Sequence, residues 1–166
     1  MVQTQVQTRS DSRTDRCPTL VLGVGNILLR DEGIGVRVVE AMAREGAPDG
    51  VELFDGATAG LDLLDALAGR RKVIVIDALD ADCEPGTVLR LEPEELAPHP
   101  AQSVSVHDIG LMETLVVARQ LGIAPESVVI LGVRPAEVDC GLELSPQIAA
   151  LVPRIVELVR AELESD

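Results

Sequence analysis

Short apolar runs along this chain predict a set of buried strands. Residues 19–25, 72–78 and 127–135 are almost wholly apolar, rich in β-branched side chains and closed by glycine, aspartate or proline, which is typical of strands inside a sheet. Residues 51–56 and 86–92 also predict strands, and the second should be less deeply buried because it is less apolar. The chain therefore supplies five candidate strands of similar, short length.

Segments with helical spacing of apolar residues separate these strands. Helices are predicted over residues 33–44, 61–67, 108–121 and 145–164, and the last one should bend at Pro153 because proline interrupts the hydrogen-bond ladder. Strands that alternate with helices indicate an α/β fold, a three-layer α/β/α sandwich with a mainly parallel sheet. We expect residues 18–166 to form one domain.

Two polar segments stand apart from this alternation. Residues 1–17 lack the apolar core of a secretion signal and predict a disordered N-terminal extension. Residues 93–106 are rich in proline, glutamate and serine and predict a loop.

Composition narrows the classes of partner. The chain is 46% hydrophobic but contains one Phe and neither Tyr nor Trp, so its core must come from Leu, Val, Ile and Ala. Acidic residues number 28 against 14 basic ones, a net charge of −14, which argues against nucleic acid or an anionic membrane as a partner. No apolar run approaches the ~20 residues of a membrane-spanning helix. We expect a cytoplasmic protein.

The cysteines Cys17, Cys83 and Cys140 are widely separated and odd in number. They form no C-x-x-C pair, so we expect three reduced thiols rather than a disulfide framework or a zinc site. A Cys–His dyad that uses Cys83 or Cys140 is not excluded by spacing, although nothing local supports it.

Ligands of parallel α/β folds bind outside the carboxyl ends of the strands. That rule directs attention to residues 25–32, 55–58, 77–79 and 134–137. Two familiar phosphate-binding motifs fail there. A dinucleotide fingerprint needs a third glycine where this chain has Leu28, and a P-loop needs a lysine where the chain offers only Lys72, far away.

A phospho-acceptor receiver domain is a further alternative. The acidic pair Asp31 and Glu32 and the strand-end Asp77 imitate part of its site, and this interpretation predicts phosphorylation at Asp77. The lysine expected after the last strand is missing, because that strand ends in Val133-Arg134-Pro135.

A carboxylate–imidazole site fits the same strand ends. Glu32 lies at a helix start, Asp77 at the end of a central strand and His107 at the start of another helix. Two carboxylates and one imidazole suit a borderline divalent metal and leave coordination positions open. Each residue also has a simpler explanation, since Asp31 or Glu32 can complement a helix dipole and His107 can cap a helix. The residues alone leave these alternatives open.

The run GVGNILLRDEGIGVR, residues 23–37, closely resembles the N-terminal motif of the nickel–iron hydrogenase maturation endopeptidases. The similarity continues in order along the chain, through residues 55–60, 75–78, 105–111, 131–135 and 142–146.

The resemblance implies a single α/β domain with a twisted sheet of the phosphorylase/hydrolase-like type. It also implies a hydrolase of hydrogenase maturation that removes a C-terminal peptide from the hydrogenase large-subunit precursor after nickel has been inserted. The family's metal-recognition Glu, Asp and His fall on Glu32, Asp77 and His107. We expect nickel to arrive with the precursor, and the protease to be a monomer.

The resemblance leaves the cleavage chemistry open between an aspartyl-type and a metal-dependent endopeptidase. Nickel can polarise the carbonyl that water attacks, or it can only position the bond while Asp31, Asp55 or Asp77 acts as general base. A metal ligand has a lowered pKa and is a weaker base, which favours Asp55. A non-cleaving, nickel-dependent hydrogenase assembly factor is the alternative function.

Overall fold

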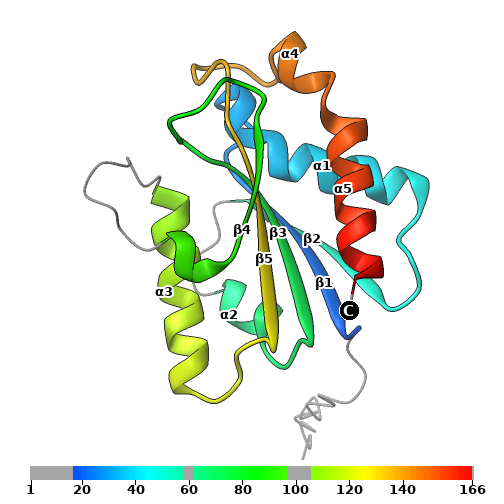
Figure 1. Cartoon of the computed structure of the whole chain (residues 1–166), viewed down its shortest axis with the longest axis vertical. Coiled ribbons are helices and arrows are strands. Elements are labelled where there is room, and N and C mark those ends of the chain that lie inside the picture. The colour runs from blue at the N-terminus through cyan, green and yellow to red at the C-terminus, as the bar shows by residue number, and fades with distance from the viewer. Residues whose placement is uncertain (1–16, 58–61, 97–105, 166) are drawn as a thin grey trace, which may run out of the picture.

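In a computed structural model of the protein, residues 17–57, 62–96 and 106–165 are described, with the backbone alone for residues 62 and 106–109 (Figure 1). Apart from Cys17, the expected extension over residues 1–17 lies outside them. The described elements are, in order, β1 (Thr19–Val24), the 3-10 turn η1 (Arg30–Gly33), α1 (Ile34–Glu45), β2 (Val51–Ala57), α2 (Asp62–Leu67), β3 (Lys72–Ala78), β4 (Val88–Leu91), the 3-10 turn η2 (Pro93–Leu96), α3 (Val106–Gln120), β5 (Ser127–Val133), α4 (Pro146–Ala149) and α5 (Val152–Glu164).

The strands form one mainly parallel sheet with the order β2-β1-β3-β5-β4 in the described chain. Strand β1 pairs in parallel with β2 and with β3, and β3 pairs in parallel with β5. Strand β4 is antiparallel to β5 and lies at the edge. An edge strand has one neighbour instead of two, which explains why the run around residues 88–91 is less apolar than the others. All five predicted strands are confirmed.

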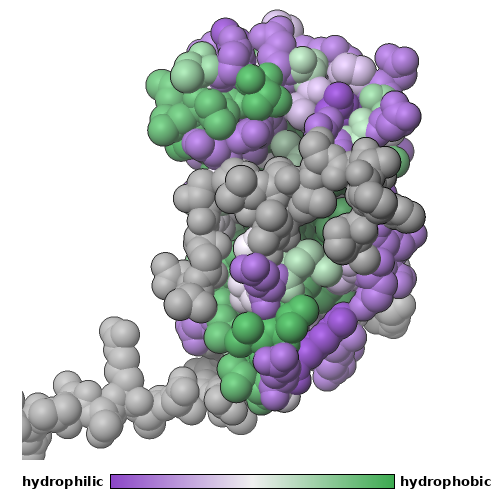
Figure 2. Space-filling view, turned by 90° about the vertical axis from the view of Figure 1, so that its left-hand side faces the viewer, coloured by the Kyte–Doolittle hydropathy of each residue, from purple (hydrophilic) through white to green (hydrophobic). Residues whose placement is uncertain are grey.

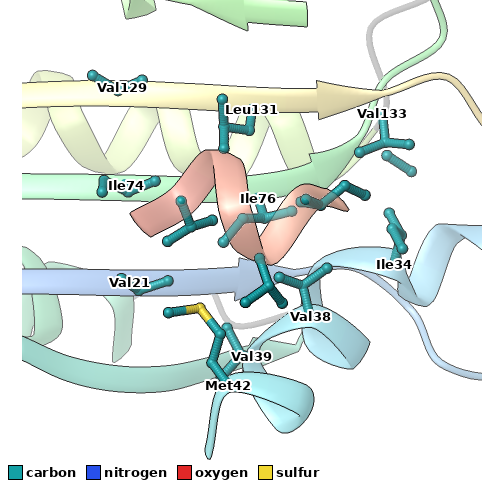
Figure 3. Packing of buried hydrophobic residues seen from close by; sticks show 14 of the residues in the cluster. Val21, Ile34, Val38, Val39, Met42, Ile74, Ile76, Val129, Leu131 and Val133 are labelled. Carbon is teal, nitrogen blue, oxygen red and sulfur yellow. The ribbon is translucent and has the colours of Figure 1, made fainter. Parts of the chain in front are cut away.

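Helices cover both faces of the sheet, so the three-layer α/β/α sandwich is also confirmed (Figure 1). Helices α1 and α5 pack on one face, where Ile74 and Ile76 of β3 join their apolar side chains (Figure 3). Helices α2 and α3 pack on the other face, against Val73 and Val75 of the same strand. This alternation along β3 decides to which face each later residue of the strand points.

Helix α1 begins in direct backbone contact with the sheet. A Cβ atom added at Gly23 would lie 2.3 Å from the Gly35 carbonyl oxygen, and one added at Gly35 would lie 2.1 Å from that of Ile76. Any side chain at either position would push the helix off the strands. Glycine at both places therefore holds the start of α1, and the turn before it, against the carboxyl ends of β1 and β3.

The single bent helix predicted over residues 145–164 is wrong. The chain forms two helices, α4 and α5, which are separated at residues 150–151. Pro146 and Pro153 each occupy the first turn of their own helix, where the missing N–H costs nothing. The break therefore precedes Pro153 instead of centring on it.

The loop predicted over residues 93–106 opens with η2, and residues 97–105 lie outside the described part of the chain. Helix α3, at 15 residues, is the longest helix described. Its length of roughly 22 Å is below the roughly 30 Å of a bilayer's hydrocarbon core. Within the described residues, no helix has the length and apolar character to cross a membrane.

Candidate functional site

The carboxyl ends of β1, β2 and β3 meet around Gly25. The Gly25 N–H donates to the Ala57 carbonyl at 2.9 Å, which joins the first two strand ends. A Cβ atom at Gly25 would lie 1.8 Å from the Glu32 carbonyl oxygen and 3.6 Å from Oδ1 of Asp77. Gly25 also has φ +134°, a backbone conformation that only glycine adopts readily. The glycine turn thus brings the backbone of Glu32 and the side chain of Asp77 to the same place.

Asp77 is a buried carboxylate at the end of a central strand. Its side chain is part of a residue that is only 4% exposed, and Oδ1 accepts a hydrogen bond from the Ala78 N–H at 2.8 Å. Asp77 follows Val73 and Val75 in the alternation of β3, so its side chain lies on the face covered by α2 and α3. Its position fits a group that acts at the carboxyl end of the sheet, on the face covered by α3.

His107 lies in the first turn of α3. The far end of this helix reaches the amino end of β3, since Gly69 donates to the Ile123 carbonyl. The helix therefore starts at the carboxyl end of the sheet, the end at which Asp77 lies. The side chain of His107 is outside the described part of the structure, and the described side chains contain no group of three His, Cys, Asp or Glu suited to a metal. The ligand set Glu32, Asp77 and His107 stays a prediction.

Asp31 is fully buried and accepts four hydrogen bonds. Its Oδ2 accepts from the N–H groups of Ala136 and Glu137 at 2.9 and 2.7 Å and from the Ser145 hydroxyl at 2.8 Å. Its Oδ1 accepts from the Ser145 N–H at 2.7 Å. A carboxylate with its lone pairs so engaged is poorly placed to accept a proton from water. The geometry favours a positioning role for Asp31 over the general base considered from the sequence.

The hydrogen bonds of Asp31 join the loop before α1 to the loop after β5. Backbone bonds reinforce the junction, because Arg30 N–H donates to the Gly141 carbonyl and Gly141 N–H donates to the Leu28 carbonyl, both at 3.0 Å. The sequence offered no signal for this pairing. Ser145 follows Asp31 by 114 positions, and its serine looks like an ordinary helix cap.

Asp55 lies on the exposed end of β2 and is separated from Asp77 by β1. Its Oδ1 accepts from the Ala57 N–H at 2.9 Å, a local turn contact. In the strand alternation Asp55 follows Leu53, which packs on the α1 face, whereas Asp77 points to the α3 face. The geometry thus gives Asp55 less support than Asp77 as a partner of Glu32.

A polar hollow of about 670 Å³ lies at the opposite end of the sheet. Thr19, Lys72 and Ser127, the first residues of β1, β3 and β5, line it together with Arg90. Because it opens at the amino ends of the strands, it is separate from the place where Gly25, Glu32 and Asp77 meet.

The two alternative chemistries receive no support from this geometry. Receiver domains of flavodoxin-like topology have five parallel strands in the order 2-1-3-4-5. Here β4 is antiparallel at the edge, and the residue after β5, Arg134, pairs with Asp80. The cysteines Cys17, Cys83 and Cys140 are free thiols. Any Cys–His dyad would need a histidine side chain that lies outside the described residues.

Comparisons with known proteins give related sequences and related structures. The sequence profile of the hydrogenase maturation protease (HycI) family matches residues 36–162. The chain is 41% identical over 146 residues to the hydrogenase 2 maturation protease of Escherichia coli strain K12, covering 87% of this chain and 89% of that protein. The structure of the hydrogenase maturating endopeptidase HybD from E. coli superposes with a TM-score of 0.80 at 40% identity, over 87% of this chain and 91% of that one. The [NiFe] hydrogenase maturation protease HybD from Thermococcus kodakarensis gives a TM-score of 0.69 at 26% identity, over 86% and 97% of the two chains.

Proposed function

Because this chain belongs to the hydrogenase maturation protease family, we propose that it removes the C-terminal peptide from the nickel-loaded precursor of a nickel–iron hydrogenase large subunit. The observation that carries the proposal is that the backbone of Glu32 and the carboxylate of Asp77 both lie against Gly25, at the carboxyl ends of the strands. A buried Asp77 carboxylate at this end of an already acidic chain suits a substrate that brings a cation with it.

In this proposal nickel is part of the substrate. Thiolates of the precursor hold the ion, and Glu32, Asp77 and His107 occupy coordination positions that the precursor leaves open. Oxygen and imidazole donors are compatible with a borderline metal such as nickel. A precursor without nickel would present no ion to these side chains, so it would bind weakly and remain uncut. Coordination would thus make cleavage conditional on metal insertion.

Cleavage needs a water oxygen to attack the scissile carbonyl while a base accepts its proton. Asp31 is disfavoured as this base because its oxygens are engaged by four donors. Asp55 is disfavoured because its strand position directs it toward the other face of the sheet. One of the two carboxylates, Glu32 or Asp77, would release nickel and act as the base when water attacks. The amine of the released peptide leaves with the transferred proton.

The decisive experiment is a mass-spectrometric cleavage assay on purified components. The chain is mixed with its hydrogenase large-subunit precursor in three forms: nickel-loaded, zinc-loaded and metal-free. Loss of a C-terminal peptide from the nickel-loaded form alone would establish both the protease and its dependence on nickel. Binding without any loss of mass would instead support the non-cleaving assembly factor.

A further inference from the structure

Four large apolar side chains are exposed on the loops at the carboxyl end of the sheet. They are Ile27 (38% exposed), Leu28 (59%), Val138 (49%) and Leu142 (62%), which we call the rim patch. The first pair belongs to the loop before α1 and the second pair to the loop after β5. Figure 2 shows hydrophobic surface gathered at this upper end of the molecule. Leucines that are about 60% exposed on loops make no contribution to the core.

Hydrogen bonds hold the two loops of the rim patch together. Asp31 accepts four of them from the second loop, and the Leu28 carbonyl accepts one from Gly141 at 3.0 Å. A loop whose backbone is already held in place loses little conformational entropy when a partner covers it. The fold therefore presents this surface ready for contact, at no benefit to its own core.

The rim patch is continuous with the candidate site. Ile27 and Leu28 lie in the turn that connects Gly25 to Glu32, and a Cβ atom at Gly33 would lie 3.0 Å from the Ile27 Cα. A chain segment that covers Leu28 would thus pass directly beside the place where Glu32 and Asp77 meet.

The charge around the rim patch is strongly acidic. The two loops, residues 26–33 and 136–145, contain five carboxylates and one guanidinium. That guanidinium, Arg30, is already paired, at 2.8 Å from Asp139 and 3.5 Å from Glu137. Nearby Arg37 donates to the Leu142 carbonyl and pairs with Glu40. A second copy of this chain would place acidic residues against acidic residues. A segment with apolar side chains and basic neighbours complements the patch.

We propose that the rim patch is the docking surface for the C-terminal segment of the hydrogenase large-subunit precursor, a stretch of apolar side chains flanked by basic ones. This proposal rests on the proposed function, because it names the part of the substrate that the site receives. Docking there leads the segment past Glu32 and Asp77, and Asp31 positions the two loops that bind it.

Helix α3 supplies a matched control for the test. Leu121, the residue directly after this helix, is 60% exposed, close to the 59% of Leu28 and the 62% of Leu142. Leu121 lies at the amino end of the sheet, since the nearby Ile123 carbonyl accepts from Gly69. Leucine to serine at the three positions removes the same apolar area, and only two of the positions belong to the rim patch.

The test measures kcat and KM for nickel-loaded precursor with Leu28→Ser, Leu142→Ser, their double variant and Leu121→Ser. Each rim variant should raise KM about 10-fold, and the double variant about 100-fold, because a covered leucine contributes binding that serine cannot. The kcat should stay within about twofold, since binding is separate from the chemical step. KM should also rise with salt, which screens the acidic surround. Leu121→Ser should leave both constants unchanged, and thermal unfolding checks that every variant is folded.

A double variant with the KM of the unmodified chain would overturn the proposal, as would an equal loss in Leu121→Ser. A binding measurement compares the precursor with its mature form, which lacks the C-terminal segment. This comparison distinguishes failure of the docking proposal from failure of the proposed function. If the chain cuts nothing, the proposed function fails, yet a preference for the precursor that the double variant loses still supports docking. Sedimentation analysis tests the remaining alternative, in which the surface binds a second copy of the chain. A dimer that Leu142→Ser dissociates would assign the surface to a second copy and overturn the proposal.

Discussion

The two ends of the sheet treat a buried charge in different ways. At the amino end Arg70, 3% exposed, donates to Glu52 at 2.7 Å and to the carbonyls of Cys17 and Ala66 at 2.7 and 2.9 Å. At the carboxyl end Asp31, fully buried, accepts from three backbone N–H groups and from the Ser145 hydroxyl. The arginine is balanced by an opposite charge, and the aspartate is satisfied by neutral donors.

We infer from this difference that the buried charge at the amino end contributes to stability, whereas the one at the carboxyl end contributes to function. The ion pair with Glu52 neutralises Arg70, and the hydrogen bonds of Arg70 join β2 and α2 to the start of β3. We therefore expect Arg70 to contribute to stability and not to function. Neutral donors leave the charge of Asp31 in place, which keeps the carboxyl end negative and suited to a cation-bearing substrate. The same donors belong to the loop that carries half of the rim patch. Substitutions at the two ends should therefore give different phenotypes.

The largest expected effect is that of Asp77→Asn at the carboxyl end. Loss of the carboxylate removes a ligand or a base, and cleavage of nickel-loaded precursor should fall by about 1,000-fold, or about 4 kcal/mol of transition-state stabilisation. Circular dichroism should show a folded protein. The control is Asp55→Asn, which should stay within about threefold of the unmodified chain. An equal loss in both variants would contradict the assignment of the two side chains to different faces.

Asp31→Ala should combine a loss of stability with a loss of binding. Four donors lose a buried acceptor, which should lower the free energy of unfolding by about 3 kcal/mol and the Tm by roughly 6–12 °C. KM for the precursor should rise because the two loops separate. Calorimetry and steady-state kinetics on the same preparation measure both effects. A stable variant with unchanged KM would show that the loops hold together without Asp31.

Arg70→Met at the amino end should affect stability alone. The guanidinium contacts are lost, but Glu52 is 40% exposed and can be rehydrated, so the free energy of unfolding should fall by about 2 kcal/mol. Cleavage of the precursor per folded molecule should be unchanged, as judged by urea unfolding and by the mass-spectrometric assay. A fall in kcat would mean that the two ends of the sheet are coupled.

The smallest effect concerns the pair of Arg90 and Glu162 beside the polar hollow. A hydrogen bond from Arg90 holds the pKa of Glu162 below its ordinary value of 4.5. Because the pKa is lowered in the folded state, the stabilisation is complete above pH 4.5 and is lost as the pH falls through the folded pKa. Glu162→Gln should therefore lower stability near neutral pH by less than about 1 kcal/mol, since Arg90 is half exposed.

The check is a pair of denaturant titrations, one near neutral pH and one in acid. The difference between Glu162→Gln and the unmodified chain should shrink in acid, and cleavage should be unaffected near neutral pH. A difference that grows on acidification would reverse the sign derived from the lowered pKa.

The local pattern was enough for the elements of the sheet. Strand β3, expected at residues 72–78, is found at Lys72–Ala78, because an uninterrupted apolar run between charged residues has one favourable state, a strand covered on both faces. The final helix shows the limit of the same reasoning. Pro153 is compatible with a bend inside one helix and also with the first turn of a new helix. Only the packing of α4 and α5 decided between these two alternatives.

By itself the sequence determined the α/β class, the strand ends where chemistry can gather and, through the resemblance, the family. The tertiary structure decided how the carboxylates differ. Asp31 and Glu32 are neighbours in the chain, yet only the folded loops reveal that Asp31 accepts hydrogen bonds from residues 136–145. Asp55 and Asp77 both end strands, and the sheet register directs them to opposite faces. Hydrogen bonds between residues more than 100 positions apart depend on long-range pairing, and so does the face of the sheet to which a strand residue points. Local pattern does not encode that pairing.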